Sequence, residues 1–415
     1  MSAEETKNNF SKSFLILITG SFFSQIINFI TAPVMTRLFS VNDIGVFSLI
    51  LTIVTLLSPI LNGRYELSII SAKRKKDIYI LVKISIYFCF ILSCIFSLIL
   101  MKLFFYNIEI YKKFFLIIPF LLFIYGYSNV ANAYNNRFAK YKLISQVNII
   151  KSFSFLILII ISSIIDLGAY GLLLSLFFSY VVPLKKQSEY LCRKLKYITK
   201  IPFCNIKRVF LENKKMLFYS VPAAFMNSLS YSATNFCIED LYGLSTLGYY
   251  SLTFRALGVP LTLISTNVSK VFFEQASKEF YEQHTFFNTF LKGLKILLLF
   301  AVPLTIFVYF ASPILCSLFF GESWIIAGEY MQILAIMFAA RFIVAPLSVG
   351  ILIIRKNTLE ILGQFLLVLN LLFVYCYSSL SKLDIKEFLE IYSCGNTIIY
   401  LIWLITLLYY AKRKF

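Results

Sequence analysis

Charged side chains are scarce in this chain: Asp, Glu, Lys and Arg make up only 14% of the 415 residues, whereas hydrophobic residues make up 59%. A soluble domain of this size cannot cover its surface with so few charges. Apolar runs of about 20 residues recur along the chain, and the polar/apolar alternation of barrel strands is missing. The composition therefore predicts an all-α polytopic membrane protein.

The residues and motifs of common enzyme sites are missing too. The single histidine, His284, lies beside Glu279 and Glu282, which is not a metal-ligand pattern, and the eight cysteines show no C-x-x-C spacing. There is no P-loop, no dinucleotide-binding glycine fingerprint and no nucleophile elbow. We therefore expect no metal, no cofactor, no ATP site and no enzymatic activity, and any uphill transport would draw on an ion or substrate gradient.

Twelve membrane spans are predicted, each close to the length that crosses a bilayer as a helix. They cover residues 14–36, 44–70, 78–104, 114–134, 144–165, 168–184, 215–238, 246–270, 287–311, 325–353, 358–380 and 387–410. The first apolar run continues without a small-residue cleavage site, so it is interpreted as an uncleaved helix rather than a signal peptide.

Acidic residues are half as frequent as basic ones, 20 against 39. With both termini in the cytoplasm, 26 of the 39 Lys and Arg fall in inner segments and six in outer ones, as the positive-inside rule predicts. The same distribution accounts for the net charge of +19, so we expect no nucleic-acid partner.

One short stretch occurs twice. Residues 38–49 align without a gap to residues 241–252, 203 positions later, and Gly45/Gly248 and Ser48/Ser251 are among the identities. The repeat predicts two six-helix bundles, residues 1–184 and 215–415. A basic cytoplasmic connector, residues 185–214, would join them as two short helices along the anionic inner leaflet, either binding lipid or only setting the topology.

Charges inside the predicted spans carry the functional argument, because a buried charge normally faces a cavity or a partner. Arg255 lies ~15 Å of helix past the corner at Gly248, near mid-membrane. Arg341 also falls near the middle of its span, and Arg64 lies in the inner third of the second span. A guanidinium fork suits phosphate oxygens, so these arginines predict an anion site for a phosphate or pyrophosphate. The alternative is that each pairs with a carbonyl or carboxylate of another span.

Few acids are available to balance these arginines. Glu66 is two residues from Arg64 and so would lie on a different helix face, which predicts that the two do not pair. Glu66, Glu239 and Asp240 are candidates for proton or sodium coupling, or else boundary residues. Lys151 is expected to reach the inner boundary by snorkelling.

Prolines inside the predicted spans are candidate hinges, since each removes a helical hydrogen bond and permits bending. Pro33 lies one turn before the first corner, Pro59 lies just before Arg64, and Pro260 lies five residues after Arg255.

Two segments resemble a known family. Residues 36–45, Thr-Arg-Leu-Phe-Ser-Val-Asn-Asp-Ile-Gly, followed by Arg64-Tyr65-Glu66, resemble the opening of the polysaccharide-biosynthesis flippases. Residues 248–255 and 271–274 are similar to the eighth span of that family. The family includes the O-antigen flippases of Gram-negative bacteria and belongs to the multidrug/oligosaccharidyl-lipid/polysaccharide (MOP) exporter superfamily.

The resemblance implies two bundles related by a pseudo-two-fold axis around a cavity that opens alternately inward and outward. It implies a multi-pass protein of the bacterial inner membrane that moves an undecaprenyl-pyrophosphate-linked oligosaccharide to the outer leaflet. Arg64 and Arg255 occupy matching stretches, whereas Arg341 comes from the charge argument alone. The expected partners are this lipid-linked oligosaccharide, the bilayer, and a polysaccharide polymerase with its chain-length regulator. Twelve spans rather than fourteen argue against lipid II as the substrate.

Two other functions stay open. A cation-coupled multidrug antiporter of the same superfamily would be expected to have deep acids, whereas the deep charges here are arginines. A membrane-embedded polysaccharide polymerase would be expected to have a large outer loop with arginines, whereas the outer connections here are short.

Overall fold

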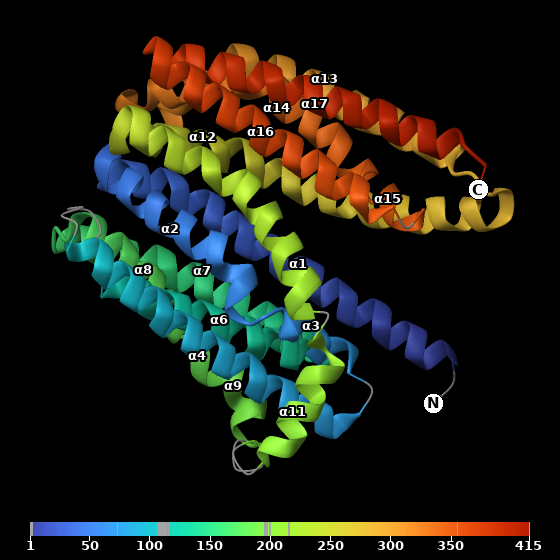
Figure 1. The fold of residues 1–415 in the computed structure, drawn as a ribbon. Coiled ribbons are helices and arrows are strands. Elements are labelled where there is room, and N and C mark those ends of the chain that lie inside the picture. Colours follow the sequence, from blue (N-terminus) through green and yellow to red (C-terminus); the bar gives the residue numbers. More distant parts are fainter. Residues whose placement is uncertain are drawn as a thin grey trace. The chain divides into compact units, whose positions relative to one another are not determined.

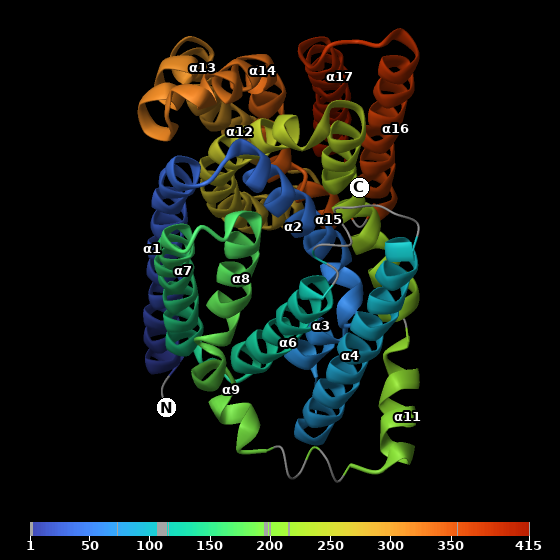
Figure 2. The same cartoon turned by 90° about the vertical axis from the view of Figure 1, so that its left-hand side faces the viewer.

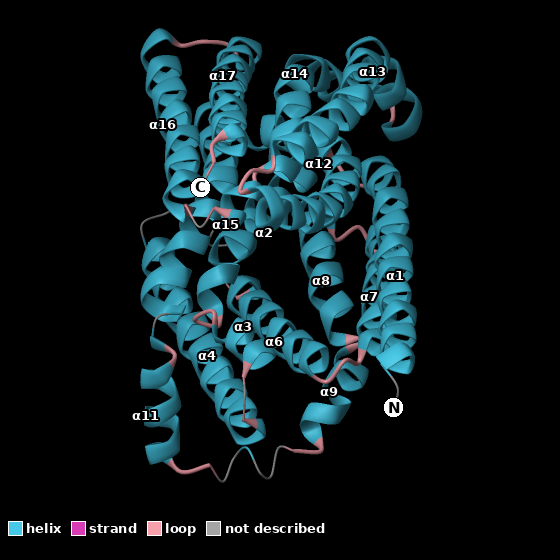
Figure 3. Ribbon diagram, turned by 90° about the vertical axis from the view of Figure 1, so that its right-hand side faces the viewer, coloured by secondary structure: helices cyan, strands magenta, loops and turns pink. Residues whose placement is uncertain are grey.

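The computed structural model describes residues 3–72, 74–105, 114, 116–194, 198, 201–214, 216–354 and 356–414. Figure 3 shows that these residues form helices and short loops, and no strand occurs among them. The predicted all-α fold is therefore confirmed. The chain divides into two compact units, Met1–Ser228 and Leu229–Phe415, which are described one at a time.

The first unit contains long helices that are followed by short ones from the connector (Figure 1). Its elements are α1 (Ala3–Leu38), α2 (Val41–Leu61), α3 (Tyr65–Ser71), α4 (Lys75–Phe105), α6 (Ile117–Arg137), α7 (Tyr141–Ile164), α8 (Gly168–Val181), α9 (Leu184–Cys192), α11 (Phe203–Glu212) and the π-helical turn η1 (Met216–Ser220).

Within this unit, α1 runs along α7, α7 packs on α8, and α4 packs on α6 (Figure 2). The short helices α9 and α11 pack against α6 and α4, respectively. The buried apolar cluster under them contains Tyr65 of α3 and Val209 of α11, each fully buried. The described part of the connector therefore packs as part of the first unit, and its predicted contact with the inner leaflet stays a prediction.

The second unit is built from one very long broken helix and the helices that pack on one another after it. Its elements are α12 (Val221–Gln283), which begins in the first unit, α13 (Phe287–Phe320), the short 3₁₀ turn η2 (Glu322–Trp324), α14 (Ile325–Leu347), α15 (Gly350–Ile353), α16 (Asn357–Ser381) and α17 (Ile385–Lys412). Helix α14 packs between α13 and α17, and α16 packs on α17.

Eight helical segments are long and apolar enough to cross a membrane, judged by length and composition within the described residues. They match eight of the twelve predicted spans. The remaining four, residues 14–36, 114–134, 215–238 and 246–270, coincide with α1, α6 and the two parts of α12. The multi-pass membrane architecture is thus supported, and the number twelve and the side of each terminus stay predictions.

The repeated corner has a structural counterpart at the same register. Helix α1 ends at Leu38, and Ser40 caps α2 by accepting a 3.1 Å hydrogen bond from the backbone N–H of Asp43. A shift of 203 residues places Gly243 opposite Ser40. Gly243 is the point where α12 breaks, with φ 80° and ψ 178°. Both copies therefore interrupt a helix at the equivalent position, one with a polar cap and one with a single glycine.

Candidate functional site

The second predicted span, residues 44–70, is broken just before its charged residues. Helix α2 ends at Leu61, two residues after Pro59, and Gly63 and Arg64 both adopt left-handed backbone conformations, with φ 57° and 60°. The chain resumes as α3 at Tyr65. A left-handed conformation costs a non-glycine residue on the order of 1–3 kcal/mol, and such strain tends to occur at functional sites.

This break brings Arg64 and Glu66 together. Arg64 Nη1 lies 3.9 Å from Glu66 Oε1, and Arg64 Nε donates a 3.4 Å hydrogen bond to Ser220 Oγ of η1. The prediction that these two side chains do not pair is therefore wrong. It assumed a continuous helix, in which residues two apart point in different directions, whereas Arg64 precedes the first residue of α3.

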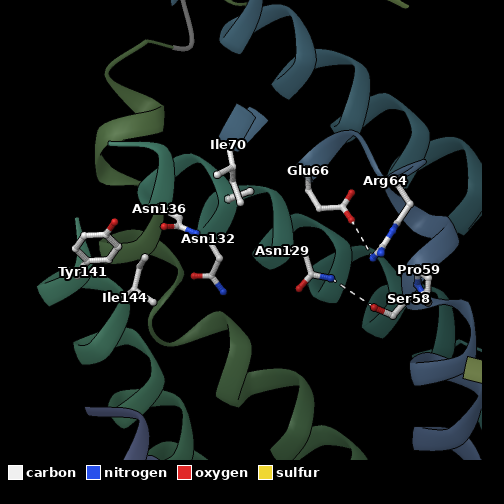
Figure 4. A pocket seen from close by; sticks show the side chains of 11 residues that line it. Ser58, Pro59, Arg64, Glu66, Ile70, Asn129, Asn132, Asn136, Tyr141 and Ile144 are labelled. Carbon is white, nitrogen blue, oxygen red and sulfur yellow. Dashed lines mark hydrogen bonds and ion pairs between the residues drawn. The ribbon is translucent and has the colours of Figure 1, made fainter. Parts of the chain in front are cut away.

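A polar pocket of about 370 Å³ begins at this pair. Its other walls come from the end of α2, from α6 and from the start of α7, and its lining residues are Ser58, Pro59, Arg64, Glu66, Ile70, Asn129, Asn132, Ala133, Asn136, Tyr141 and Ile144. Figure 4 shows three asparagine side chains in a row that leads from Tyr141 towards Arg64 and Glu66. The whole pocket lies within the first unit.

The asparagine row follows from helical spacing. Asn129, Asn132 and Asn136 stand at i, i+3 and i+7 on α6, which places them on one face. Asn129 Nδ2 lies 3.5 Å from Ser58 Oγ, a long contact. The sequence reading missed this row, although its spacing was visible in the sequence.

A buried glutamine of the connector fixes the middle of the row. Gln187 of α9 is 1% exposed, and its Nε2 donates 3.0 Å hydrogen bonds to Asn132 Oδ1 and to the backbone carbonyl of Ser128. Asn135 Nδ2 donates in turn to the Gln187 carbonyl at 2.9 Å. These bonds hold α9 to α6 and orient the Asn132 amide beside the pocket.

Glu66 is the acid of this site. Its side chain is 16% exposed, and its buried Oε2 atom has no hydrogen-bond partner among the described residues. A carboxylate oxygen in that situation is costly to keep charged. Glu66 therefore differs from the ordinary solvated acids of the chain.

The other two predicted arginines lie in the second unit. Arg341 of α14 stacks its guanidinium on aromatic rings, 4.5 Å from the Tyr231 centroid, 5.4 Å from Phe254 and 5.9 Å from Phe338. Arg255, on the second part of α12, is half-buried. No carboxylate pairs with Arg341 among the described residues, so the rings take the place of the counter-ion that the alternative interpretation required.

The acids Glu239 and Asp240 lie at the end of the first part of α12, within four residues of the break at Gly243. Asp240 is exposed and accepts a 2.7 Å hydrogen bond from the Tyr375 hydroxyl. Of the candidate hinges, Pro33 lies inside α1 and Pro59 next to the end of α2. The side chain of Pro260 lies outside the described residues.

Lys151 is a half-buried cation of the first unit. It lies ten residues after the first residue of α7, or ~15 Å along the helix. Its ammonium is 3.4 Å from the ring centroid of Tyr180 on α8, and no carboxylate pairs with it among the described residues. Tyr180 lies in the last turn of α8, just before the connector, and the expectation that Lys151 snorkels to the inner boundary stays a prediction.

Comparisons with known proteins identify the family. The family model described as "Polysaccharide biosynthesis protein" matches residues 34–328. The teichuronic acid biosynthesis protein TuaB of Bacillus subtilis is 27% identical over 128 residues, 31% of this chain and 26% of that protein. An uncharacterized membrane protein in the cps region of Klebsiella pneumoniae is 26% identical over 166 residues, 39% of this chain and 34% of that protein. Each match thus spans about a third or less of the relative.

Solved structures agree in fold at low sequence identity. The lipid II flippase MurJ, in an inward closed conformation, superposes with a TM-score of 0.73 at 14% identity, covering 96% of this chain and 88% of that one. A multidrug resistance MATE transporter of the MOP superfamily, facing inward, gives 0.70 at 14% identity over 92% and 93% of the two chains. A family model that spans most of its length shows that the chain belongs to the polysaccharide biosynthesis protein family, and its fold is shared with these two transporters.

Proposed function

We propose that this protein is a flippase, not an enzyme, that moves an undecaprenyl-pyrophosphate-linked oligosaccharide from the inner to the outer leaflet of the bacterial inner membrane by alternating access. Membership of a polysaccharide biosynthesis family and the fold shared with a lipid II flippase support a transporter of lipid-linked substrates. The oligosaccharide would be an O-antigen or similar repeat unit.

The observation that carries the proposal is the loosely held arginine at one end of the polar pocket. A separation of 3.9 Å from Glu66 and a 3.4 Å hydrogen bond to Ser220 are both long for contacts of a guanidinium. A pyrophosphate offers shorter, bidentate contacts to the same fork, so it can displace these partners. Arg64 would thus bind the pyrophosphate when the pocket faces the cytoplasm.

Glu66 would couple this binding to an ion gradient. Two negative groups beside one arginine repel each other, so Glu66 has to take up a proton, or turn away towards a sodium ion, when pyrophosphate binds. Its Oε2 atom, which has no hydrogen-bond partner in the part of the chain that the structure describes, is suited to carry that proton. Glu239 and Asp240 are the other coupling candidates, although the exposed position of Asp240 gives it less reason to change its protonation.

Arg255 and Arg341 are the candidate pyrophosphate-binding residues of the second unit. Three aromatic rings lie close to the Arg341 guanidinium, and it has no carboxylate partner among the described residues, so an anion would supply its counter-charge. Pro33, Pro59 and Pro260 would permit the bending of helices during transport.

The experiment is deletion of the gene, followed by localisation of the lipid-linked oligosaccharide. Single repeat units that accumulate on the inner leaflet, with loss of surface polysaccharide, are the expected result. Single units that reach the outer surface without being polymerised would overturn the flippase and favour a polymerase. An intact polysaccharide coat would overturn it in favour of the antiporter.

Arginine substitutions then test the site. Arg64→Ala and Arg255→Ala should each abolish restoration of surface polysaccharide in the deleted cells, with normal amounts of protein in the membrane. Arg193→Ala is the matched control, because Arg193 is 66% exposed and its partners, Glu189 and the ring of Tyr190, lie on the same short helix outside the pocket. Unchanged export by Arg64→Ala would remove Arg64 from the mechanism.

One observation favours a second candidate, a cation-coupled multidrug antiporter: the buried Glu66 is an acid inside a pocket, as such transporters would need. Deletion of the gene distinguishes the flippase from the antiporter. An antiporter predicts greater sensitivity to cationic drugs and normal surface polysaccharide.

A further inference from the structure

The asparagine row of the first unit is suited to a ligand that is polar but uncharged. Each amide of Asn129, Asn132 and Asn136 offers both donors and an acceptor and has no net charge. The row starts at the Arg64–Glu66 pair and runs away from it towards Tyr141 (Figure 4). A ligand that fills the pocket would therefore have a charged group at one end and neutral hydrogen-bonding groups behind it.

Two buried amides of the first unit use their side-chain N–H groups differently from the asparagine row. Gln187 and Asn135 are each 1% exposed, and the side-chain nitrogen of each donates hydrogen bonds to protein acceptors. Asn132 is engaged through Oδ1 only, and the Nδ2 atom has no protein partner among the described residues. Asn136 has no side-chain hydrogen bond there at all, and Asn129 has only the 3.5 Å contact to Ser58. Because Asn129 and Asn132 are half-buried and Asn136 is exposed, these unpaired amide groups are accessible to a ligand.

The size of the pocket limits that ligand. A volume of about 370 Å³ is at the lower end of the ~300–1,000 Å³ typical of small-molecule sites, which suits one or two sugar rings rather than a whole oligosaccharide. Tyr141 and Ile144 give the far end of the pocket an apolar wall. A pyranose has this combination of surfaces, with hydroxyls at its edge and apolar C–H groups on its faces.

We propose that Asn129, Asn132 and Asn136 form the subsite for the sugar next to the pyrophosphate and bind its hydroxyl or acetamido groups, with Gln187 as the positioning residue for Asn132. The inference rests on the proposed function, because the sugar reaches this pocket only as part of the lipid-linked substrate. It adds that the first unit distinguishes a glycosylated lipid from the bare lipid pyrophosphate.

The test compares two ligands on the full-length protein in detergent. One is the lipid-linked oligosaccharide extracted from cells that lack this gene, and the other is undecaprenyl pyrophosphate. We expect the unaltered protein to bind the glycosylated lipid more tightly. Asn132→Leu, which keeps the side-chain volume, should weaken that binding roughly 3- to 10-fold and leave the Kd for undecaprenyl pyrophosphate unchanged.

Two further variants separate the subsites. Arg64→Leu should weaken the binding of both lipids, because the pyrophosphate is common to them. Asn42→Leu is the matched control, since Asn42 is exposed in the first turn of α2 and lies outside the pocket. It should change neither Kd.

The outcomes distinguish this inference from the function on which it rests. Deleted cells that accumulate no lipid-linked oligosaccharide would overturn the proposed function, and the sugar subsite with it. If the oligosaccharide accumulates but the unaltered protein binds both lipids equally, or Asn132→Leu weakens both equally, the sugar subsite is wrong and the flippase stands.

Discussion

Arg64 Nη1 lies 3.9 Å from Glu66 Oε1, although the two residues are only two positions apart in the sequence. The contact exists because Gly63 and Arg64 turn through left-handed backbone conformations between α2 and α3. The pocket therefore begins with a cation and an acid that constrain each other. Any ligand that competes for the cation changes the surroundings of the acid.

Glu66→Gln should uncouple transport from the ion gradient without abolishing substrate binding. Glutamine keeps the shape and can still donate a hydrogen bond, but it neither binds nor releases a proton. In inverted vesicles, we expect flipping by the variant to become insensitive to a protonophore or a sodium ionophore, whichever inhibits the unaltered protein.

The control for this experiment is Glu189→Gln. Glu189 also contacts an arginine, Arg193, but it is 48% exposed on α9, outside the pocket. Its variant should keep the sensitivity of the unaltered protein. If Glu66→Gln keeps that sensitivity as well, coupling occurs elsewhere, and Glu239 and Asp240 become the next residues to replace.

Gly243→Ala should destabilise the protein by about 1–3 kcal/mol, because φ 80° with ψ 178° is a conformation that essentially only glycine adopts. The control is Gly258→Ala in the second part of the same helix. Neither glycine has any atom within 4 Å of an added Cβ, so the two changes differ in backbone conformation and not in steric room.

The measurement is the thermal unfolding midpoint of both variants in detergent. Alanine at position 258 should be neutral or stabilising by up to about 1 kcal/mol, as in other helix interiors. Equal midpoints for the two variants would mean that α12 is not broken at Gly243.

Local signals made much of the fold predictable. The helix after the first corner follows from Ser40 and Asp43, which form a capping box, and the break at the second corner coincides with a glycine. The break at Gly63 was also encoded, but the apolar run continues beyond it. Hydrophobicity alone therefore predicted one long span from 44 to 70.

The site was less predictable because much of it depends on contacts between distant residues. Gln187 reaches Asn132 from 55 positions away, so no local pattern reveals that it orients the pocket. The asparagine row, in contrast, was visible as the spacing i, i+3, i+7 on a predicted span. Its amides carry no charge, so the argument from charges inside the spans does not include them.

Gln187→Leu should lower the stability of the first unit and weaken the pocket together. The change removes the donor to Asn132 Oδ1 and Ser128 Oγ in a site that is 1% exposed, and each side-chain acceptor left unpaired costs about 1–3 kcal/mol. We expect a lower unfolding midpoint and weaker binding of the glycosylated lipid. Gln187→Glu at high pH should also lower the unfolding midpoint and weaken binding, because an ionised carboxylate cannot donate a hydrogen bond.

Lys151 and Tyr180 should be strongly coupled in stability. Lys151 lies in the middle of α7, and its ammonium is 3.4 Å from the centroid of the Tyr180 ring on α8. A desolvated cation–π contact contributes roughly 2 kcal/mol. Tyr180→Leu should therefore destabilise the protein, because the buried cation loses its ring. Lys151→Met should be neutral or stabilising, because it removes a charge that is costly to bury. The double variant should recover most of the stability that Tyr180→Leu loses.

A double-mutant cycle on thermal or denaturant unfolding measures this coupling, with Lys140 and Tyr190 as the matched pair. Their cation–ring distance is 4.5 Å, and Lys140 lies at the start of α7 rather than in its middle. Because water screens such contacts, that coupling should be nearer 0.5–1 kcal/mol. If the Lys151 and Tyr180 substitutions prove additive, the ammonium does not depend on the ring, and Lys151 reaches another partner in the membrane.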